Sequence, residues 1–289
     1  ILVIYVLYNF NDDIVKQIPM LSILTLAVIK LLPIIQGMFT NITRMRFNFN
    51  SINIIEKNIN DSNKIIEKYK IKKQFFRSIE LIGIGFNYDK KKVFKNISFK
   101  IENGDFWLLY GESGSGKTTL TEIMLGFMIP NSGKILINNK LDKSNSLLSK
   151  KLNVGYVSQD IILFEGNCIE NIILKSNYEL LKIKEKINFL VDFFSMNDII
   201  ESIGGIEGFI SESGKNLSAG QRQRIILARA LFRNPELLIL DEATSALNSK
   251  LEENIINKLI KSKITIFMIT HNESLKKLTD KIVILNNKK

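Results

Sequence analysis

One stretch of the chain has the spacing of a phosphate-binding loop: residues 111–118 read GESGSGKT. The apolar run 106–110 before it predicts a buried strand, and residues 118–125 after it have helix-compatible spacing. Such glycines let backbone N–H groups converge on phosphate oxygens, and the following helix adds its positive end. We therefore expect nucleotide binding, with Lys117 at the outer phosphates and the Thr118 hydroxyl on Mg²⁺. The alternative is a glycine-rich turn with a surface lysine.

Two carboxylates follow a second apolar run. Residues 237–240 read LLIL, a pattern typical of a central parallel strand, and Asp241 and Glu242 come next. In a phosphate-loop protein Asp241 would lie near the Mg²⁺. Glu242 would then be placed as the general base toward an attacking water. Adjacent carboxylates could alternatively be a helix-start signal.

The sequence LSAGQRQR at 217–224 relates these motifs to a family. It resembles the signature of ATP-binding cassette (ABC) proteins, with Ala219 where glycine is usual. Alone, it could be a helix cap of small residues, but it stands between the two motifs above in the family's order. The resemblance implies that Ser218 and Gly220 bind the nucleotide held by a partner domain.

The resemblance, which covers positions 84–285, also gives roles to isolated residues. Tyr88 stands where the family stacks an aromatic ring on adenine, with a core tyrosine as the alternative. Gln159 resembles the glutamine that touches Mg²⁺ and the attacking water, with a polar turn residue as the alternative. His271, the only histidine, resembles the switch histidine at the γ-phosphate.

The expected site can now be stated in full. The catalytic residues are Glu242, His271 and Gln159, and the Mg²⁺ ligands are Thr118, Gln159 and Asp241. ATP contacts are expected from Tyr88, Gly111, Ser113, Gly114, Ser115, Gly116, Lys117, Thr118, Thr119, Ser218 and Gly220.

Two further matches concern the type of protein. Residues 245–248 resemble the loop that crosses the dimer interface, with Asn248 where aspartate is usual. Glu212 with Gly214 is similar to the exporter type rather than the importer type, although an ordinary loop is the alternative. The sequence IKLLP at 29–33 is similar to lipid-linked oligosaccharide flippases.

An apolar segment at 20–39 carries one charge, Lys30, and one proline, Pro33, and has about the length of a spanning helix. Arg44 and Arg46 follow it, which places its C-terminal side in the cytoplasm. A buried helix of a soluble protein is the alternative. Residues 1–8 are apolar but too short to span a bilayer, and because the chain begins with Ile1 we expect a fragment or a processed form.

The net charge of +11 suggests an acidic partner. Residues 61–100 hold eleven Lys and Arg against four Asp and Glu, which fits a membrane surface, nucleic acid or merely a solvated surface. The single cysteine, Cys168, excludes an internal disulfide framework and reads as a small buried hydrophobe.

The expected fold class is α/β, a P-loop ABC nucleotide-binding domain with a helical subdomain, preceded by a transmembrane helix. We expect residues 1–46 to end a transmembrane domain (last membrane helix about 20–39) and 47–76 to form an intracellular helix or linker. The ABC domain would occupy 77–289, with its helical subdomain at about 160–231. Strands are expected at 80–84, 93–101, 133–137, 154–157 and 264–269, and mostly helix at 168–194.

The resemblance predicts part of an exporter-type half-transporter in the cell (inner) membrane, with its ATPase domain cytoplasmic and ATP and Mg²⁺ as cofactors. The expected partners are a second ABC subunit, identical or different, the membrane, and an exported or flipped substrate, anionic and lipid-linked if Lys30 faces the translocation cavity. The alternative for Lys30 is pairing with an acidic residue on another helix. The rival functions are a soluble ABC ATPase acting on nucleic acid, which we do not expect as a partner, and a degenerate, non-catalytic cassette.

Overall fold

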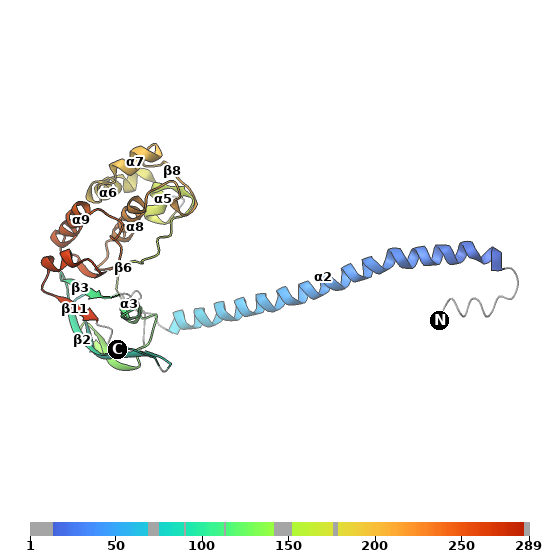
Figure 1. The fold of residues 1–289 in the computed structure, drawn as a ribbon, viewed down its shortest axis with the longest axis horizontal. Helices are drawn as coiled ribbons and strands as arrows, with labels where there is room; N and C mark the ends of the chain where they lie inside the picture. The colour runs from blue at the N-terminus through green and yellow to red at the C-terminus, as the bar shows by residue number, and fades with distance from the viewer. Residues whose placement is uncertain are drawn as a thin grey trace. The chain divides into compact units, whose positions relative to one another are not determined.

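The computed structural model describes residues 14–68, 75–89, 91–112, 114–141, 152–175 and 179–285. The chain divides into two compact units, Ile1–Lys70 and Ile71–Lys289, and each is described by itself (Figure 1).

The first unit is a single long helix, α2 (Ile14–Lys68), as far as the structure describes it. Within it, Ser22–Ile59 is long and apolar enough to cross a membrane, and an 18-residue window of this stretch has a mean hydropathy of 1.8. Large apolar side chains along this stretch are exposed, Ile29 and Phe39 among them. The helix begins before the expected segment and continues past Pro33, where one backbone hydrogen bond is lost.

Within the region expected as a helix or linker, 47–76, the helix α2 continues to Lys68, and residues 69–74 lie outside the described chain. Residues 75–77 are not helical, and Phe76 is buried in the core of the second unit. The second unit, Ile71–Lys289, thus includes Phe76, a residue that the sequence pattern assigned to the helix or linker before the ABC domain. Burial of this phenylalanine, next to a strand of alternating apolar residues, is favourable because it removes a large apolar side chain from water.

The second unit contains two larger sheets. An antiparallel four-stranded sheet has the order β2-β1-β4-β5, and a parallel five-stranded sheet has the order β11-β3-β10-β9-β6. A short pair, β7-β8, forms a third sheet. The strands are β1 (Ser78–Tyr88), β2 (Lys91–Glu102), β3 (Phe106–Gly111), β4 (Ser132–Ile137), β5 (Lys140–Leu141), β6 (Val154–Val157), β7 (Gly166–Asn167), β8 (Phe209–Ile210), β9 (Leu237–Asp241), β10 (Thr265–Thr270) and β11 (Ile282–Leu285).

Helices cover both faces of the parallel sheet. They are α3 (Lys117–Leu125), α5 (Cys168–Ile173), α6 (Leu180–Phe193), α7 (Asn197–Ile203), α8 (Ala219–Phe232) and α9 (Ser249–Lys261), with 3₁₀ turns η1 (Glu212–Gly214) and η2 (Glu273–Leu278). Figure 1 shows α5, α6 and α7 grouped together beside α8 in the second unit, away from β2.

Alternation along the central strands divides the core in two. In β10, Ile266 and Met268 pack with the helices α5 to α9 on one face, whereas Phe267 and Ile269 pack with α3 and the antiparallel sheet on the other. A strand apolar on both faces must be central, as expected for a covered parallel sheet. Cys168 lies fully buried here, and burial raises the pKa of its thiol to about 12, so it acts as a small apolar side chain.

The expected strands are present, several of them longer than the sequence pattern suggested. The expected helical region at 168–194 is α5 and α6, with residues 176–178 outside the described chain. Tyr88 ends β1 and Lys91 begins β2.

Candidate functional site

Four loops leave the same edge of the parallel sheet. The strands β3, β10, β9 and β6 are neighbours in that order and run parallel, so their carboxyl ends lie together. The segments that follow them begin at Glu112, His271, Glu242 and Ser158. Open parallel sheets bind ligands at this edge. The topology therefore gathers the residues that the sequence motifs had singled out.

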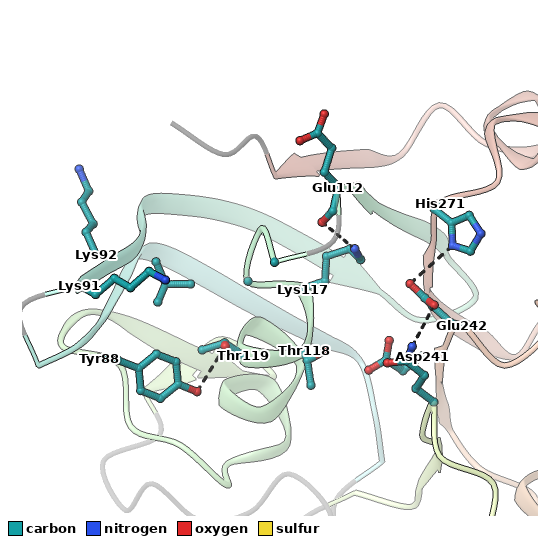
Figure 2. Close-up of a pocket in the computed structure, with 14 residues that line it drawn as sticks. Tyr88, Lys91, Lys92, Glu112, Lys117, Thr118, Thr119, Asp241, Glu242 and His271 are labelled. Carbon is teal, nitrogen blue, oxygen red and sulfur yellow. Dashed lines mark hydrogen bonds and ion pairs between the residues drawn. The ribbon is translucent and has the colours of Figure 1, made fainter. Parts of the chain in front are cut away.

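The loop after β3 is held in a tight curl. Gly114 and Gly116 have φ values of +77° and +94°, which side chains with a Cβ rarely adopt. A Cβ on Gly116 would lie 2.5 Å from Val93 Cγ1, so the loop is also closely packed. Lys117 is buried, and its ammonium donates to the carbonyl oxygens of Gly111 and Glu112, each at 2.9 Å. Figure 2 shows the contact with Glu112.

One buried atom in this loop has no partner. Among the described residues, the Ser115 hydroxyl is the buried side-chain polar atom that makes no hydrogen bond. Leaving such a group unsatisfied costs about 1–3 kcal/mol, so a partner from outside the chain is expected there. Together with the glycine curl and the Lys117 charge, this orphan hydroxyl fits a phosphate group in the loop.

Asp241 is buried at the end of β9. Burial, together with the charge of Glu242, raises the pKa of Asp241 to about 6, against the lowering effect of Lys117. A second cation would offset this cost. The oxygen donors that line the cleft beside it, Thr118 and Gln159, are of the kind that Mg²⁺ prefers, so the residues present fit that ion.

Glu242 is held between two other predicted catalytic residues. Gln159 donates from Nε2 to one carboxylate oxygen of Glu242 at 3.3 Å. His271 Nδ1 lies 3.6 Å from the other carboxylate oxygen (Figure 2). The backbone of Glu242 has a φ of +50°, unusual for a residue with a side chain, and its N–H donates to the Ile269 carbonyl. Strained backbone of this kind concentrates at functional sites.

Tyr88 lies at the far end of the same cleft. Its ring is about half exposed, at 47%, and packs edge-on against Phe86 with 5.0 Å between ring centroids. Its hydroxyl lies 3.5 Å from the Thr119 hydroxyl. The alternative of a fully buried core tyrosine does not hold, because Tyr88 is about half exposed and lines the cleft.

The cleft has a volume of about 1010 Å³. Its walls include most of the residues predicted from the sequence: Tyr88, Gly114, Gly116, Lys117, Thr118, Thr119, Gln159, Asp241, Glu242 and His271. Gly111 and Ser115 support the loop from behind, and Ser113 lies outside the described residues. Lys91, Lys92 and Glu112 also line the cleft and were not predicted.

Ser218 and Gly220 do not line this cleft. They begin α8, where the Ser218 hydroxyl accepts from the Gln221 N–H at 3.2 Å and the Gln221 side chain accepts from the Ser218 N–H at 2.9 Å. This reciprocal capping box fixes the backbone at the helix N-terminus. The structure thus divides the predicted nucleotide contacts between a cleft and a helix end that does not line it.

Two polar residues that the sequence motifs did not indicate support the loop after β9. Gln223, buried on α8, donates to the Ser245 hydroxyl at 3.1 Å and accepts from the Ala246 N–H at 2.9 Å. Glu252, buried on α9, accepts from the Thr244 hydroxyl at 2.6 Å. A sequence signal existed for Glu252, since it falls on the apolar stripe of an amphipathic helix.

Glu252 also reaches the segment that carries His271. Its second carboxylate oxygen accepts from the Asn272 side-chain N–H at 2.8 Å. The residues around this contact enclose a second, smaller cavity of about 390 Å³, which Glu242 and His271 border as well. One buried carboxylate therefore links the loop of Glu242 to the loop of His271.

Comparison with known proteins places this geometry in a family. Residues 94–245 match the family described as ABC transporter. A protein of Rickettsia bellii named as an export ATP-binding/permease protein is 37% identical over 72% of this chain, and an ATP-dependent permease of Candida albicans is 35% identical over 72%. An ATP-dependent lipid A-core flippase of Paraburkholderia xenovorans is 32% identical over 73%.

The solved structure of a bacterial Atm1-family ABC exporter with ATP bound matches the fold. Its TM-score is 0.65 at 24% identity, over 81% of this chain and 44% of that chain. Of the three sequence relatives, this chain spans 37%, 31% and 35% of the length. It thus corresponds to about a third of each.

The chain belongs to the ABC transporter family, since the family match covers more than half of it. Its fold is the α/β fold of an ABC ATP-binding domain, preceded by an apolar helix long enough to span a membrane. The expected fold class is therefore confirmed. Which of the named residues bind and react remains a prediction.

The Glu252 contacts lead to a test by paired substitution. Asn272→Asp would place a second carboxylate against that of the buried Glu252. Glu252→Gln would instead place a side-chain amide N–H against the side-chain N–H of Asn272. Each is expected to lower the free energy of unfolding by ~1–3 kcal/mol. In the combined variant the new amide can donate to the new carboxylate, so much of the loss should be recovered.

Urea unfolding of the nucleotide-free protein measures all four free energies in the cycle. Asn188→Asp, an exposed change of the same chemistry on α6, serves as the control and should alter stability little. Losses that simply add in the double variant would show that the Glu252–Asn272 contact does not link the two loops.

Proposed function

We propose that this chain binds and hydrolyses Mg²⁺–ATP and powers export or lipid flipping as part of an exporter-type half-transporter. The convergence of Lys117, Asp241, Glu242 and His271 on one cleft supports this proposal most directly. The sequence relatives reported above are named for permease, export or flippase activity.

The residues of the cleft divide the chemistry among them. Mg²⁺, when bound, supplies positive charge to the phosphate oxygens. Thr118, Asp241 and Gln159 would hold it, and Lys117 would turn its ammonium from its own loop carbonyls to the outer phosphates. Tyr88, which is about half exposed and lines the cleft, would stack its ring on the base.

Glu242 takes the role of general base in this proposal. Gln159 and His271 approach its two carboxylate oxygens from different sides, which fixes the direction in which the carboxylate faces. A carboxylate oriented in this way can accept a proton from a water at the terminal phosphate. The intact set of groups argues against a degenerate cassette kept only for dimerisation.

Ser218 and Gly220 would complete the site of a second ABC subunit. They lie outside the chain's own cleft, at the N-terminus of α8, where free N–H groups and the helix dipole favour an anion. Two copies, or this chain with a different ABC subunit, would then form two composite sites. Each would use the cleft of one chain and the helix end of the other.

The apolar helix α2 would cross the cell (inner) membrane, with the ATP-binding domain in the cytoplasm. Arg44 and Arg46, which follow the most apolar part of α2, support this orientation. The substrate would be anionic and lipid-linked, attracted by Lys30 within the apolar segment. The rival function of a soluble ATPase acting on nucleic acid has no support among the relatives reported above.

Glu242→Gln is expected to keep ATP binding and to lose ~10²–10⁴-fold of the hydrolysis rate, because the amide cannot accept the proton. Steady-state phosphate release and a binding titration with a fluorescent ATP analogue measure the two quantities. A rate near that of the unchanged protein would exclude Glu242 as the general base.

Composite sites can be tested with two damaged chains. Ser218→Arg would block the helix end, and Lys117→Ala would remove the phosphate-binding ammonium. A heterodimer of the two contains one site with an intact cleft and an intact helix end, so ATPase activity should return relative to either homodimer. Heterodimers isolated through two different affinity tags that stay inactive would contradict the arrangement.

Lys30→Met should reduce the stimulation of ATPase activity by a polyprenyl phosphate, if the ammonium attracts the substrate. A charge near the centre of a bilayer costs ~2.5–3.5 kcal/mol and therefore usually faces protein or a wet cavity. Activity of the protein in lipid nanodiscs, with and without the lipid, is the measurement, and Lys57→Met on the same helix is the control. Unchanged stimulation would mean that Lys30 is structural.

A further inference from the structure

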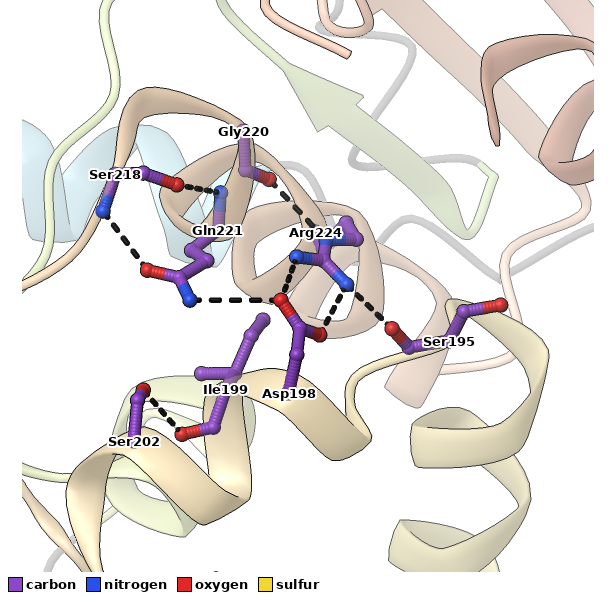
Figure 3. Close-up of polar contacts among 8 residues, drawn as sticks. All are labelled: Ser195, Asp198, Ile199, Ser202, Ser218, Gly220, Gln221 and Arg224. Carbon is purple, nitrogen blue, oxygen red and sulfur yellow. Dashed lines mark hydrogen bonds and ion pairs between the residues drawn. The ribbon is translucent and has the colours of Figure 1, made fainter. Parts of the chain in front are cut away.

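The N-terminus of α8 is attached to the neighbouring helix α7 through one carboxylate. Asp198, in the first turn of α7, accepts two hydrogen bonds from the guanidinium of Arg224, each at 2.6 Å (Figure 3). Arg224 is buried, and it donates in addition to the carbonyl oxygens of Ser195 and Gly220. Asp198 is thus the anionic partner of a buried cation.

The same carboxylate reaches the capping box. The Gln221 side-chain N–H donates to Asp198 Oδ2 at 3.4 Å, while the Gln221 oxygen accepts from the Ser218 N–H. Figure 3 shows Asp198 between Gln221 and Arg224, with Ser218 one contact further on. Hydrogen bonds from Arg224 and Gln221 together lower the pKa of Asp198, so the carboxylate stays charged at neutral pH.

Bidentate contacts of this type set orientation as well as distance. Arg224 and Gln221 lie on the first turns of α8, so the position of the Asp198 carboxylate sets the direction in which the helix N-terminus points. Asp198 itself does not line the chain's own cleft. Any effect on hydrolysis must therefore pass through α8.

We propose that Asp198 is a positioning residue for Ser218 and Gly220, and that it acts on the nucleotide held by the partner subunit rather than on that of its own cleft. The inference rests on the composite sites of the proposed function. In this proposal the Asp198 carboxylate belongs with the N-terminus of α8, which is the part of each chain that contributes to the partner's nucleotide site.

A displaced α8 could also affect hydrolysis in a second way, through Gln223, and this alternative can be tested against the proposal. Gln223, also on α8, contacts Ser245 and Ala246 in the loop that follows Glu242 of the same chain. If a change at Asp198 displaced α8 and acted mainly through Gln223, hydrolysis would be impaired in the chain's own cleft. The two routes predict opposite results in mixed dimers.

The experiment uses Asp198→Asn in the whole protein, in lipid nanodiscs. The asparagine side chain keeps the size of the aspartate but loses the charge and one acceptor. ATPase turnover of the homodimer should fall about tenfold to about 10²-fold, the range that a misplacement of about 1 Å can cost. Affinity for a fluorescent ATP analogue should stay unchanged, because the cleft is intact. Asp192→Asn, an exposed change of the same kind on α6, should alter neither quantity.

Two heterodimers then separate the routes. In the first heterodimer, the Asp198→Asn chain is paired with a Lys117→Ala chain. One site then combines the intact cleft of the Asp198→Asn chain with the intact helix end of the Lys117→Ala chain. ATPase activity should therefore return to the level of the heterodimer of Ser218→Arg and Lys117→Ala chains. In the second heterodimer, the Asp198→Asn chain is paired with a Ser218→Arg chain. Both chains then have a damaged helix end, so neither site is complete and ATPase activity should stay low.

The reverse pattern, recovery with Ser218→Arg and none with Lys117→Ala, would overturn the proposal in favour of the Gln223 route. Low activity in both mixtures, or full activity of the Asp198→Asn homodimer, would overturn it as well. If the Ser218→Arg and Lys117→Ala pair itself shows no recovery, the composite sites fail rather than the role of Asp198 within them. Should Asp198→Asn not fold, Asp198→Glu, which keeps the charge but shifts it by one methylene, goes through the same mixtures.

Discussion

The parallel register of four strands is the constraint on which the site depends. Ile269 of β10 pairs with Leu109 of β3 on one side and with Asp241 of β9 on the other. The segments carrying Lys117, His271 and Glu242 therefore leave the sheet at one level. Because each central strand is apolar on both faces, a slip by one residue would exchange the two halves of the core and move every loop.

Register alone does not orient a side chain in a loop, and here buried polar contacts do so. The loop after β9 is attached to α8 by Gln223 and to α9 by Glu252, while Glu252 also holds Asn272 beside His271. These attachments allow Glu242 to keep a left-handed backbone conformation, which costs about 1–3 kcal/mol elsewhere in a chain. The strained residue and its supports form one unit.

The fold, the phosphate loop and the two carboxylates could be predicted because their signals are local, whereas Tyr88, Gln159 and His271 were indicated by the family resemblance. The glycine spacing at 111–118 and the carboxylates after 237–240 each describe one strand and the loop that follows it. Long-range partners carry no such signal: Glu252 and Asn272 are twenty residues apart, and nothing in either neighbourhood indicates the other. The burial of Phe76 is a related case, since it is decided by strands far along the chain.

Buried polar side chains are expensive, so their distribution shows where position matters more than stability. In the ATP-binding unit many of them lie around the cleft edge or on α8, among them Lys117, Asp241, Gln223 and Arg224. Most of these groups find partners within the chain. The Ser115 hydroxyl, in the loop suited to phosphate, does not. The free-energy cost of this unsatisfied hydroxyl lies in a loop that a ligand can reach. Ligand binding would therefore complete the hydrogen bonding of the loop as well as fill the cleft.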